Sequence, residues 1–251
     1  MPLISTTALC VRRFPYSETS LILWLYTRER GLLKVLAKGA FRTTKAGKSQ
    51  FDGGIDLLEE GACVVTDRRE KDLNLLTEWK LLDSRRSLRR RSRSLMLALY
   101  VAELIGQLFE QYSPDASMYD RVIDVLDDLS TDRREEALIA FVIDLLTRQG
   151  IPPRLGECVL CERDITFEAV AHFSPSRGGV LCERHAAEVP DAARITPTLL
   201  ATMLVGSRAE SVLDWPRLTR RQADPINRLL MDHIEIQTQH DLRLRGNVVA
   251  R

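Results

Sequence analysis

Hydrophobic and polar residues alternate along the first eighty positions in a manner typical of β-strands. In residues 20–27 three leucines fall on one face, while Ile22, Trp24 and Tyr26 fall on the other. Runs of this kind, joined by short turns, are Leu3–Val11, Ser20–Thr27, Leu32–Gly39, Ile55–Thr66 and Leu73–Leu82. Five short strands in so little chain predict a small barrel, and the OB-fold is the five-stranded barrel that binds single-stranded nucleic acid.

The hydrophobic period changes to that of a helix after Asp83. We expect one long helix over residues 84–111, buried because it is apolar nearly all round from Leu95 to Phe109. Four shorter helices are expected after it. The first lies near residues 114–129, and the second ends at a stop signal at Gly150–Pro153. The third runs from a Thr196–Pro197 cap to about Arg208, and the fourth follows a Thr219–Gln222 capping box. Pro225 is expected to kink or restart the last of these helices.

Two pairs of candidate metal ligands follow the third predicted helix. Cys158-x2-Cys161 is followed, after twenty residues, by Cys182-x2-His185. Zinc favours four tetrahedral sulfur or nitrogen ligands, and each pair can bind the ion from a tight turn. The intervening chain contains strand-forming residues and ends in Gly178–Gly179, which predicts a short β-ribbon. The pattern predicts one structural zinc ion held by these four side chains.

Other interpretations of these residues are weaker. His172 is the alternative fourth ligand, and the cysteines could instead be unconnected buried thiols. A zinc deaminase requires an H-x-E motif upstream of a P-C-x2-C pair, whereas all four histidines here follow the first pair and Glu157 precedes Cys158. A thioredoxin-like redox pair would require a βαβ pattern, which the sequence lacks. The metal is therefore expected to be a scaffold and not a reaction centre.

The patterns together predict an α+β multidomain protein. Residues 1–82 are expected to form an N-terminal five-stranded OB-fold β-barrel that binds nucleic acid. Residues 83–153 and 191–251 are expected to form an all-α helical domain. Residues 154–190 would be a zinc-binding module inserted into that helical domain.

Cysteine usage predicts a cellular compartment, and the distribution of charge predicts a class of partner. Five cysteines in a metal-type pattern, without a charged and then apolar leader, indicate the reducing cytosol. The most apolar stretch, Leu95–Leu108, is too short to span a bilayer, so no membrane segment is expected. Residues 1–93 carry 19 Lys and Arg against 11 Asp and Glu, a net charge of +8, while residues 94–251 carry 17 against 24, a net charge of −7. This asymmetry predicts a polyanion-binding face.

Two basic clusters are candidates for that face. An arginine run between positions 85 and 93 has helical spacing at Arg85, Arg86, Arg89, Arg90 and Arg93. A second cluster, on the third predicted strand and a polar loop at residues 42–50, consists of Lys34, Lys38, Arg42, Lys45 and Lys48. Phosphates would relieve the repulsion within the arginine run, although a solvated face paired with the acidic half is the simpler alternative. Candidates for stacking on unpaired bases, or else for the core, are Tyr16, Trp24, Tyr26 and Phe41.

The most distinctive motif of the sequence lies in two of the predicted strands. It consists of YSETSLILWLYT at Tyr16–Thr27 and GLLKVLAKGA at Gly31–Ala40, followed by Arg42. This motif resembles the N-terminal pattern of the RecO family of bacterial recombination mediator proteins, and the order of barrel, helices and inserted zinc module is similar over the whole chain. Two features depart from that pattern: Ser49–Asp52 lacks the usual proline, and His185 stands where the fourth zinc ligand is usually cysteine.

The resemblance implies a non-enzymatic, cytoplasmic and nucleoid-associated protein of DNA repair and recombination. It implies binding to single- and double-stranded DNA, annealing of complementary strands, association with RecR and with the acidic C-terminal tail of single-stranded DNA-binding protein, and help in loading RecA. Lys34, Lys38 and Arg42 lie in the matched motif and are the expected barrel contacts with DNA. One alternative is an RNA-binding barrel with a zinc knuckle that acts in RNA processing or translation. A zinc hydrolase is the other, and it lacks an open metal site and a candidate base.

Overall fold

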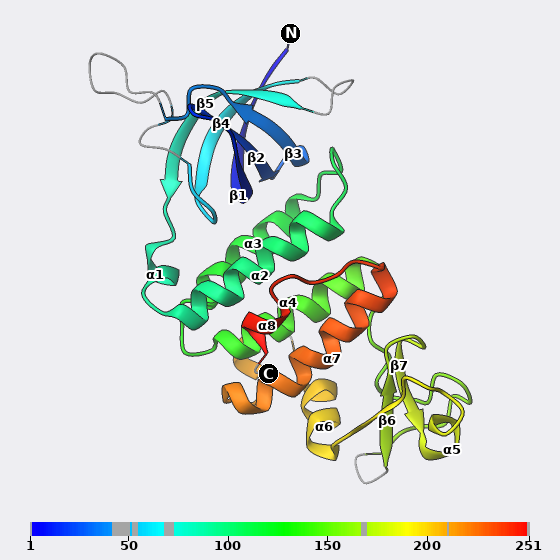
Figure 1. Ribbon diagram of the computed structural model, residues 1–251. Helices are drawn as coiled ribbons and strands as arrows, with labels where there is room; N and C mark the ends of the chain where they lie inside the picture. Colours follow the sequence, from blue (N-terminus) through cyan, green and yellow to red (C-terminus); the bar gives the residue numbers. More distant parts are fainter. Residues whose placement is uncertain are drawn as a thin grey trace. The chain divides into compact units, whose positions relative to one another are not determined.

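The alternating N-terminal segment forms a closed five-stranded barrel in the computed structural model, which describes residues 2–41, 51, 55–67, 73–166, 170–209 and 211–249 (Figure 1). Its strands are β1 (Leu3–Ser17), β2 (Ser20–Thr27), β3 (Gly31–Ala37), β4 (Glu60–Thr66) and β5 (Asn74–Asp83). Around the barrel they follow the order β1-β2-β3-β5-β4, and β4 closes the sheet by pairing with β1. The predicted five strands and their OB-like arrangement are confirmed.

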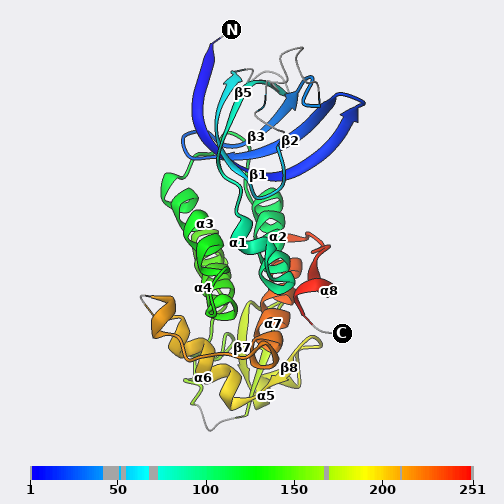
Figure 2. The same cartoon turned by 90° about the vertical axis from the view of Figure 1, so that its left-hand side faces the viewer.

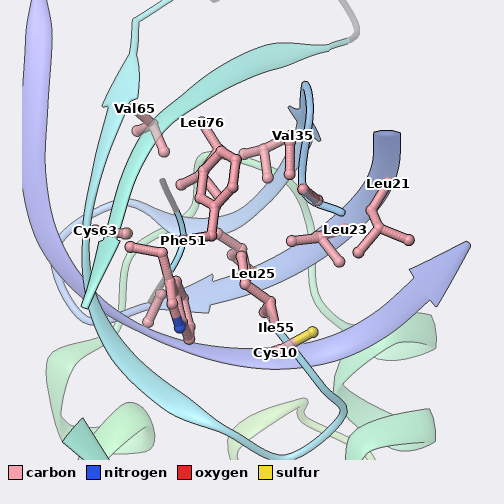
Figure 3. Packing of buried hydrophobic residues seen from close by; sticks show 14 of the residues in the cluster. Cys10, Leu21, Leu23, Leu25, Val35, Phe51, Ile55, Cys63, Val65 and Leu76 are labelled. Atoms are coloured by element: carbon pink, nitrogen blue, oxygen red, sulfur yellow. The ribbon is translucent and has the colours of Figure 1, made fainter. Parts of the chain in front are cut away.

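Apolar side chains from every strand fill the barrel interior. The three leucines of β2 that share one face, Leu21, Leu23 and Leu25, are all buried in this core. Phe51 is fully buried among them, and Figure 3 shows its ring in the middle of the cluster. Because side chains occupy the interior, the barrel can bind a ligand only on its outer surface.

Strand β1 runs six residues further than predicted, and its last part is separated from the first by a bulge. The pairing with β2 shifts by one residue between Cys10 and Arg12. In a regular strand these two residues would share a face, but one extra residue exchanges the faces. Cys10 is therefore buried in the barrel core, while Arg12 lies half-buried on the outer surface. Figure 2 shows β1 curving around the barrel.

The prediction of one long helix over residues 84–111 is wrong. The structure instead has a single turn, α1 (Arg86–Arg89), followed by α2 (Ser92–Leu108). Arg91 between them is extended, with φ of −134°, and no side chain caps either helix at its start. Clustered like charges at helical spacing disfavour a continuous helix here. Consequently the arginines of the run do not lie on one helical face. The buried character of α2 is as predicted.

Residues 1–126 form one compact unit of the described chain, and residues 127–251 form the other. The first unit includes α2 and most of α3 (Ala116–Asp128) because these helices pack on the outside of the barrel. Tyr26 of β2 is fully buried there, with its ring 5.2 Å from that of Phe109 and 5.6 Å from that of Tyr119. The unit therefore extends beyond residue 82, where the sequence places the end of the barrel, and the predicted domain boundaries stay a prediction.

A buried ion pair fixes the chain where it leaves the barrel. The Arg85 guanidinium, 3% exposed, donates to Glu60 of β4 at 2.8 Å, and the Tyr119 hydroxyl donates to the other oxygen of Glu60 at 3.1 Å. Burial and then the nearby Glu60 carboxylate raise the pKa of Tyr119, which keeps its hydroxyl protonated as a donor. Arg85, predicted as a DNA contact, is thus buried and occupied by structural partners.

The second unit combines helices with a small sheet. Its helices are α4 (Arg134–Arg148), α5 (Glu183–Ala186), α6 (Pro197–Gly206), α7 (Arg220–Thr238) and α8 (Arg245–Val248), with a 3-10 turn η1 (Val212–Asp214). The Thr196 hydroxyl caps α6 by accepting from the Leu199 N–H, and Gln222 accepts from the Thr219 N–H at the start of α7, as predicted. Helix α7 continues through Pro225 in its second turn without a restart. Among the described residues, no helix is long and apolar enough to cross a membrane.

The ion pair of Arg85 predicts an asymmetry within the arginine run. Replacing Arg85 by Met leaves the Glu60 side chain, which is 16% exposed, without its cation, so we expect the free energy of unfolding to fall by about 3 kcal/mol. Arg86→Met is the matched control, because its side chain is exposed, and should change stability by less than about 0.5 kcal/mol. Urea unfolding followed by intrinsic fluorescence measures both values, and equally small effects would contradict the structural role of Arg85.

Candidate metal centre and nucleic-acid interface

The first pair of candidate metal ligands lies in a tight turn beside a β-hairpin. The Cys158 N–H donates to the Arg163 carbonyl at 2.8 Å, and the Glu162 N–H donates to the Cys158 carbonyl at 2.8 Å. Glu162 adopts the left-handed conformation, with φ of 57°, that reverses the chain. A further bond from the Val159 N–H to the Val180 carbonyl, at 3.0 Å, attaches this turn to strand β7.

The second pair comes from the end of the hairpin. Strands β6 (Ala171–Ser174) and β7 (Gly179–Cys182) form the predicted ribbon, and β8 (Ala193–Ile195) adds a third strand beyond the expected limit at residue 190. Cys182 is the last residue of β7, and His185 lies on the single turn α5 that follows. Glycine at position 179 lets β7 lie close to the backbone at Arg154, since a Cβ there would lie 2.5 Å from the Arg154 carbonyl oxygen.

The four predicted ligands meet in one place. The donor atoms of Cys158, Cys161, Cys182 and His185 all lie within 4.8 Å of one another. His185 Nδ1 is 3.5 Å from the Cys158 sulfur and 3.4 Å from the Cys182 sulfur. Around a tetrahedral zinc ion, sulfur and nitrogen ligands are separated by about 3.5 Å, so the group fits this metal. His172, the alternative ligand, lies on β6 outside the group.

The electrostatics of the cluster suit a cation. Burial raises the pKa of the Cys158 thiol, but backbone N–H groups, chiefly that of Cys182, and the His185 side chain outweigh it and lower the pKa to about 6. At Cys161 a backbone N–H of Arg163 lowers the pKa, yet burial and the neighbouring cysteines raise it overall. Sulfurs packed this closely oppose each other's ionisation, and a bound cation removes that opposition.

The segment that carries the candidate metal ligands packs on α7 in the same unit. His233 of α7 is buried, and its Nε2–H donates to the Ile151 carbonyl at 2.8 Å while its ring lies 5.9 Å from that of Phe173 on β6. Gln237 donates to the Pro175 carbonyl at 2.7 Å. Burial lowers the pKa of His233, so the ring is neutral at pH 7 and needs no counter-charge. The segment is thereby tied to the longest helix of the unit.

The predicted DNA contacts fall into different environments. Lys34 is half-buried on β3, and Lys38 is exposed just after it. Arg42, Lys45 and Lys48 lie outside the described residues. In the arginine run, Arg86 and Arg90 are exposed and Arg93 is half-buried at the start of α2. Arg89 donates to the Leu57 carbonyl at 2.9 Å and lies 3.4 Å from an oxygen of Asp56, so it is partly engaged within the fold.

Strand register assembles a row of cations and one indole on the outer face of the barrel. Arg12 of β1 is directly opposite Trp24 of β2, and Trp24 is directly opposite Lys34 of β3. The Arg12 guanidinium carbon lies 4.5 Å from the centroid of the Trp24 ring, and the Lys34 ammonium nitrogen lies 4.7 Å from it. Both distances are within the range of cation–π attraction. We call Arg12, Trp24 and Lys34 the cation–indole row.

Phe14 lies beside this row, with its ring centroid 6.4 Å from that of Trp24, and two further aromatic residues of the same unit are exposed. Phe14 and Tyr16, on the last part of β1, are 41% and 62% exposed, and Phe41 is 53% exposed with the Arg13 guanidinium 5.8 Å from its centroid. Sequence reasoning missed Arg12, Arg13 and Phe14, because it ended β1 at Val11. The signal was present in the order Arg-Arg-Phe-Pro-Tyr, since two cations are followed there by two aromatic residues, but the bulge that turns Arg12 outward is invisible in a period-two pattern.

Comparison with known proteins finds one family for both parts of the chain. Residues 1–85 match the family model described as Recombination protein O N terminal, and residues 89–245 match Recombination protein O C terminal. The chain belongs to the RecO family. The two matched regions meet close to residue 82, where the sequence analysis divides the chain, although the compact units divide at residue 126.

RecO proteins of several bacteria are similar along most of the chain. A protein from Rhodopirellula baltica is 33% identical over 178 residues, which is 70% of this chain and 64% of that protein. One from Anaeromyxobacter sp. is 28% identical over 92% of this chain and 91% of its own length. One from Exiguobacterium sibiricum is 27% identical over 96% and 93%. All three are named DNA repair protein RecO.

The ligand geometry predicts one zinc ion per chain, with His185 and not His172 as its fourth ligand. Elemental analysis should find the metal retained in His172→Gln and reduced in His185→Gln, and zinc affinity should fall as the pH is lowered because cysteine binds as the thiolate.

Cys158→Ser should destabilise residues 127–251 while leaving DNA binding by the barrel largely intact. Metal loss in His172→Gln alone would contradict the assignment, and lost DNA binding in a stable Cys158→Ser protein would contradict a scaffold role.

Proposed function

We propose that this RecO protein is a non-enzymatic mediator of DNA repair and recombination. It binds single- and double-stranded DNA, anneals complementary strands and, together with RecR, helps to load RecA onto DNA coated with single-stranded DNA-binding protein. Family membership supports the pathway, and resemblance to that family supports RecR, RecA and the acidic tail of single-stranded DNA-binding protein as partners. The protein would act on the nucleoid.

The outer face of β1, β2 and β3 is the observation that carries this proposal. It presents the two cations of the cation–indole row with the exposed Phe14 beside Trp24, on a barrel whose interior is full. Proteins that bind single strands without sequence preference combine a positive groove for the backbone with aromatic surfaces for the bases. In OB-folds this surface includes strands two and three, which here carry Trp24 and Lys34.

Annealing follows from charge neutralisation without a covalent step. Each phosphate that a lysine or arginine contacts releases counterions, so affinity is independent of sequence and falls by about 0.7 log unit per log unit of salt for each phosphate of a single strand. When two strands are held on basic surfaces, their mutual repulsion is reduced and pairing becomes faster. The protein supplies proximity and charge, and base pairing supplies the specificity.

The metal fits a structural part in this function. Three cysteines and one histidine would complete tetrahedral coordination and leave no position for a substrate or an activated water. Bound zinc would supply folding energy, with an apparent binding energy on the order of 10 kcal/mol in zinc-finger peptides. The four ligands join the turn at Cys158 to the end of β7, and that sheet packs on α7, so the ion would hold the fold of the second unit.

Annealing of two complementary fluorescent oligonucleotides tests the proposed function. We expect the protein to accelerate pairing without nucleotide, on bare strands and on strands coated with single-stranded DNA-binding protein. Competition between DNA and RNA oligomers of one sequence then separates the RNA-binding alternative, since a strong dependence on the 2′-hydroxyl favours RNA. Tight binding without any acceleration of pairing would overturn the mediator function.

Reversing charges on the barrel should weaken DNA binding specifically. The triple variant Lys34→Glu, Lys38→Glu and Arg42→Glu removes three candidate phosphate contacts, so we expect lower affinity for single strands and a salt slope smaller by about 2 log units per log unit of salt. The matched control reverses three exposed arginines of the second unit, Arg177, Arg194 and Arg221, and has the same change in net charge. Equal losses in the two variants, measured by fluorescence anisotropy, would refute the barrel as the binding surface.

A further inference from the structure

We propose that Arg13 and Arg89 form one binding site for a phosphodiester group of DNA, and that the Asp56 carboxylate is an internal anion that competes with DNA for this site. The inference rests on the proposed binding of single-stranded DNA. It assigns Arg13 as an additional phosphate contact and Asp56 as a residue that limits the affinity for DNA.

Two arginines from distant parts of the first unit converge on one carboxylate. Arg13 lies on the last part of β1, and its Nη1 is 3.5 Å from Asp56 Oδ1. Arg89 is the last residue of α1, and its Nη2 is 3.4 Å from Asp56 Oδ2. A phosphodiester also carries its negative charge on two oxygens bonded to one atom, and guanidinium groups bind both kinds of anion. The carboxylate therefore marks a place from which one phosphate can contact both arginines.

The ion pairs of Asp56 are of a kind that another anion can displace. Both nitrogen–oxygen distances exceed the roughly 2.8 Å of a strong charge-assisted hydrogen bond. The side chains of Arg13, Asp56 and Arg89 are 35%, 50% and 37% exposed, so water and salt reach all three. Exposed ion pairs contribute little to stability, and the exchange of one anion for another at this site therefore has a small cost.

Backbone groups of one turn hold Asp56 and Arg89 in place. Asp56 Oδ1 accepts from the Leu57 N–H at 2.8 Å, and the Asp56 N–H donates to the Glu59 carboxylate at 2.9 Å. The Arg89 guanidinium donates to the Leu57 carbonyl at 2.9 Å. Because this last bond does not involve the carboxylate, Arg89 stays ordered when Asp56 is displaced. A cation that is already ordered loses less conformational freedom on binding a phosphate.

An exposed aromatic ring lies beside Arg13. The guanidinium carbon is 5.8 Å from the centroid of Phe41, which is 53% exposed. Every phosphate of a single strand has a base within one nucleotide, so a phosphate on Arg13 brings a base within reach of Phe41. The site thus combines cations for the backbone with an aromatic surface for a base, as proteins that bind single strands without sequence preference do.

A competing carboxylate has a consequence for the proposed annealing activity. A strand that the protein holds must leave it once the strand has paired. When the strand leaves, Asp56 can pair again with Arg13 and Arg89, and these contacts stabilise the protein without DNA. Asp56 therefore weakens the retention of a strand and favours its release into the duplex.

Asp56→Asn tests the competition. Asparagine keeps an oxygen that can accept from the Leu57 N–H but loses the charge that pairs with both arginines. We expect single-stranded DNA to bind about three- to tenfold more tightly, as measured by fluorescence anisotropy. Unchanged or weaker binding would overturn the inference, and weaker binding would show that Asp56 positions the arginines instead of competing for them.

Glu59→Gln is the matched control, because it removes the same charge from the same turn. Glu59 accepts from the Asp56 N–H and, among the described residues, forms an ion pair with neither arginine. Salt screens its effect on a bound phosphate, so we expect the affinity to change by less than about twofold. Equal gains in Glu59→Gln and Asp56→Asn would reduce the effect to local charge and would overturn the competition.

The double variant Arg13→Met, Arg89→Met tests whether the two arginines share one phosphate. It should bind single strands more weakly, with a salt slope smaller by about 0.7 log unit per log unit of salt, the value for one phosphate. A decrease of about 1.4 would assign a separate phosphate to each arginine and would overturn the shared site. Unchanged affinity in a folded variant would remove both arginines from the DNA-binding surface.

A double-mutant cycle tests whether Asp56 acts through the arginines. In the Arg13→Met, Arg89→Met background, Asp56→Asn should have little further effect on affinity, because the cations for which it competes are gone. A full gain in that background would contradict the competition. If the double variant is unstable without the bond to Leu57, the cycle of Arg13→Met with Asp56→Asn applies the same test to one ion pair.

Failure of this inference can be distinguished from failure of the proposed function. If the unaltered protein does not bind single strands, the proposed function fails. If it binds them and the Asp56→Asn variant binds no more tightly, only the present inference fails.

Discussion

Closure of the N-terminal sheet is the constraint on which the DNA-binding surface depends. Once β4 pairs with β1, every strand has an inner face that must be apolar, and Leu21, Leu23 and Leu25 supply it together with Phe51. A filled barrel leaves only the outside for chemistry. Part of that outside is covered where Tyr26 packs on Phe109 and Tyr119. The bulge after Cys10 then places Arg12 outward beside Trp24, so the basic face is a consequence of how the barrel closes and where it is covered.

The second unit depends on a different constraint, which is the meeting of two short ligand pairs. Among the described residues, few backbone hydrogen bonds join the turn at Cys158 to β7, and the sheet has three short strands. The sheet buries Phe173, Val180 and Leu181, and in so small a structure a metal ion commonly supplements the core. His233, which is buried and neutral, and Gln237 both lie on α7, and their hydrogen bonds attach this segment to that helix.

Much of the architecture could be predicted because it follows from local sequence patterns. Period two gave the strands, the Thr196 and Thr219 caps gave the starts of two helices, and the spacing of cysteines gave a ligand group that the fold assembles. Two of the failures depend on distant parts of the chain. Arg85 looked like one more member of a basic run, but it is paired with Glu60, twenty-five residues earlier. The bulge of β1 depends on its pairing with β2, whereas the break at Arg91 follows from the repulsion within the run itself.

The path of the DNA is the central claim, and photo-crosslinking measures it most directly. A single strand carrying 5-iodouracil would be irradiated with the whole protein, and the modified residues located by mass spectrometry of tryptic fragments. We predict crosslinks at the exposed aromatic residues of the barrel unit, which are Phe14, Tyr16 and Phe41. Crosslinks confined to residues 127–251 would contradict the account.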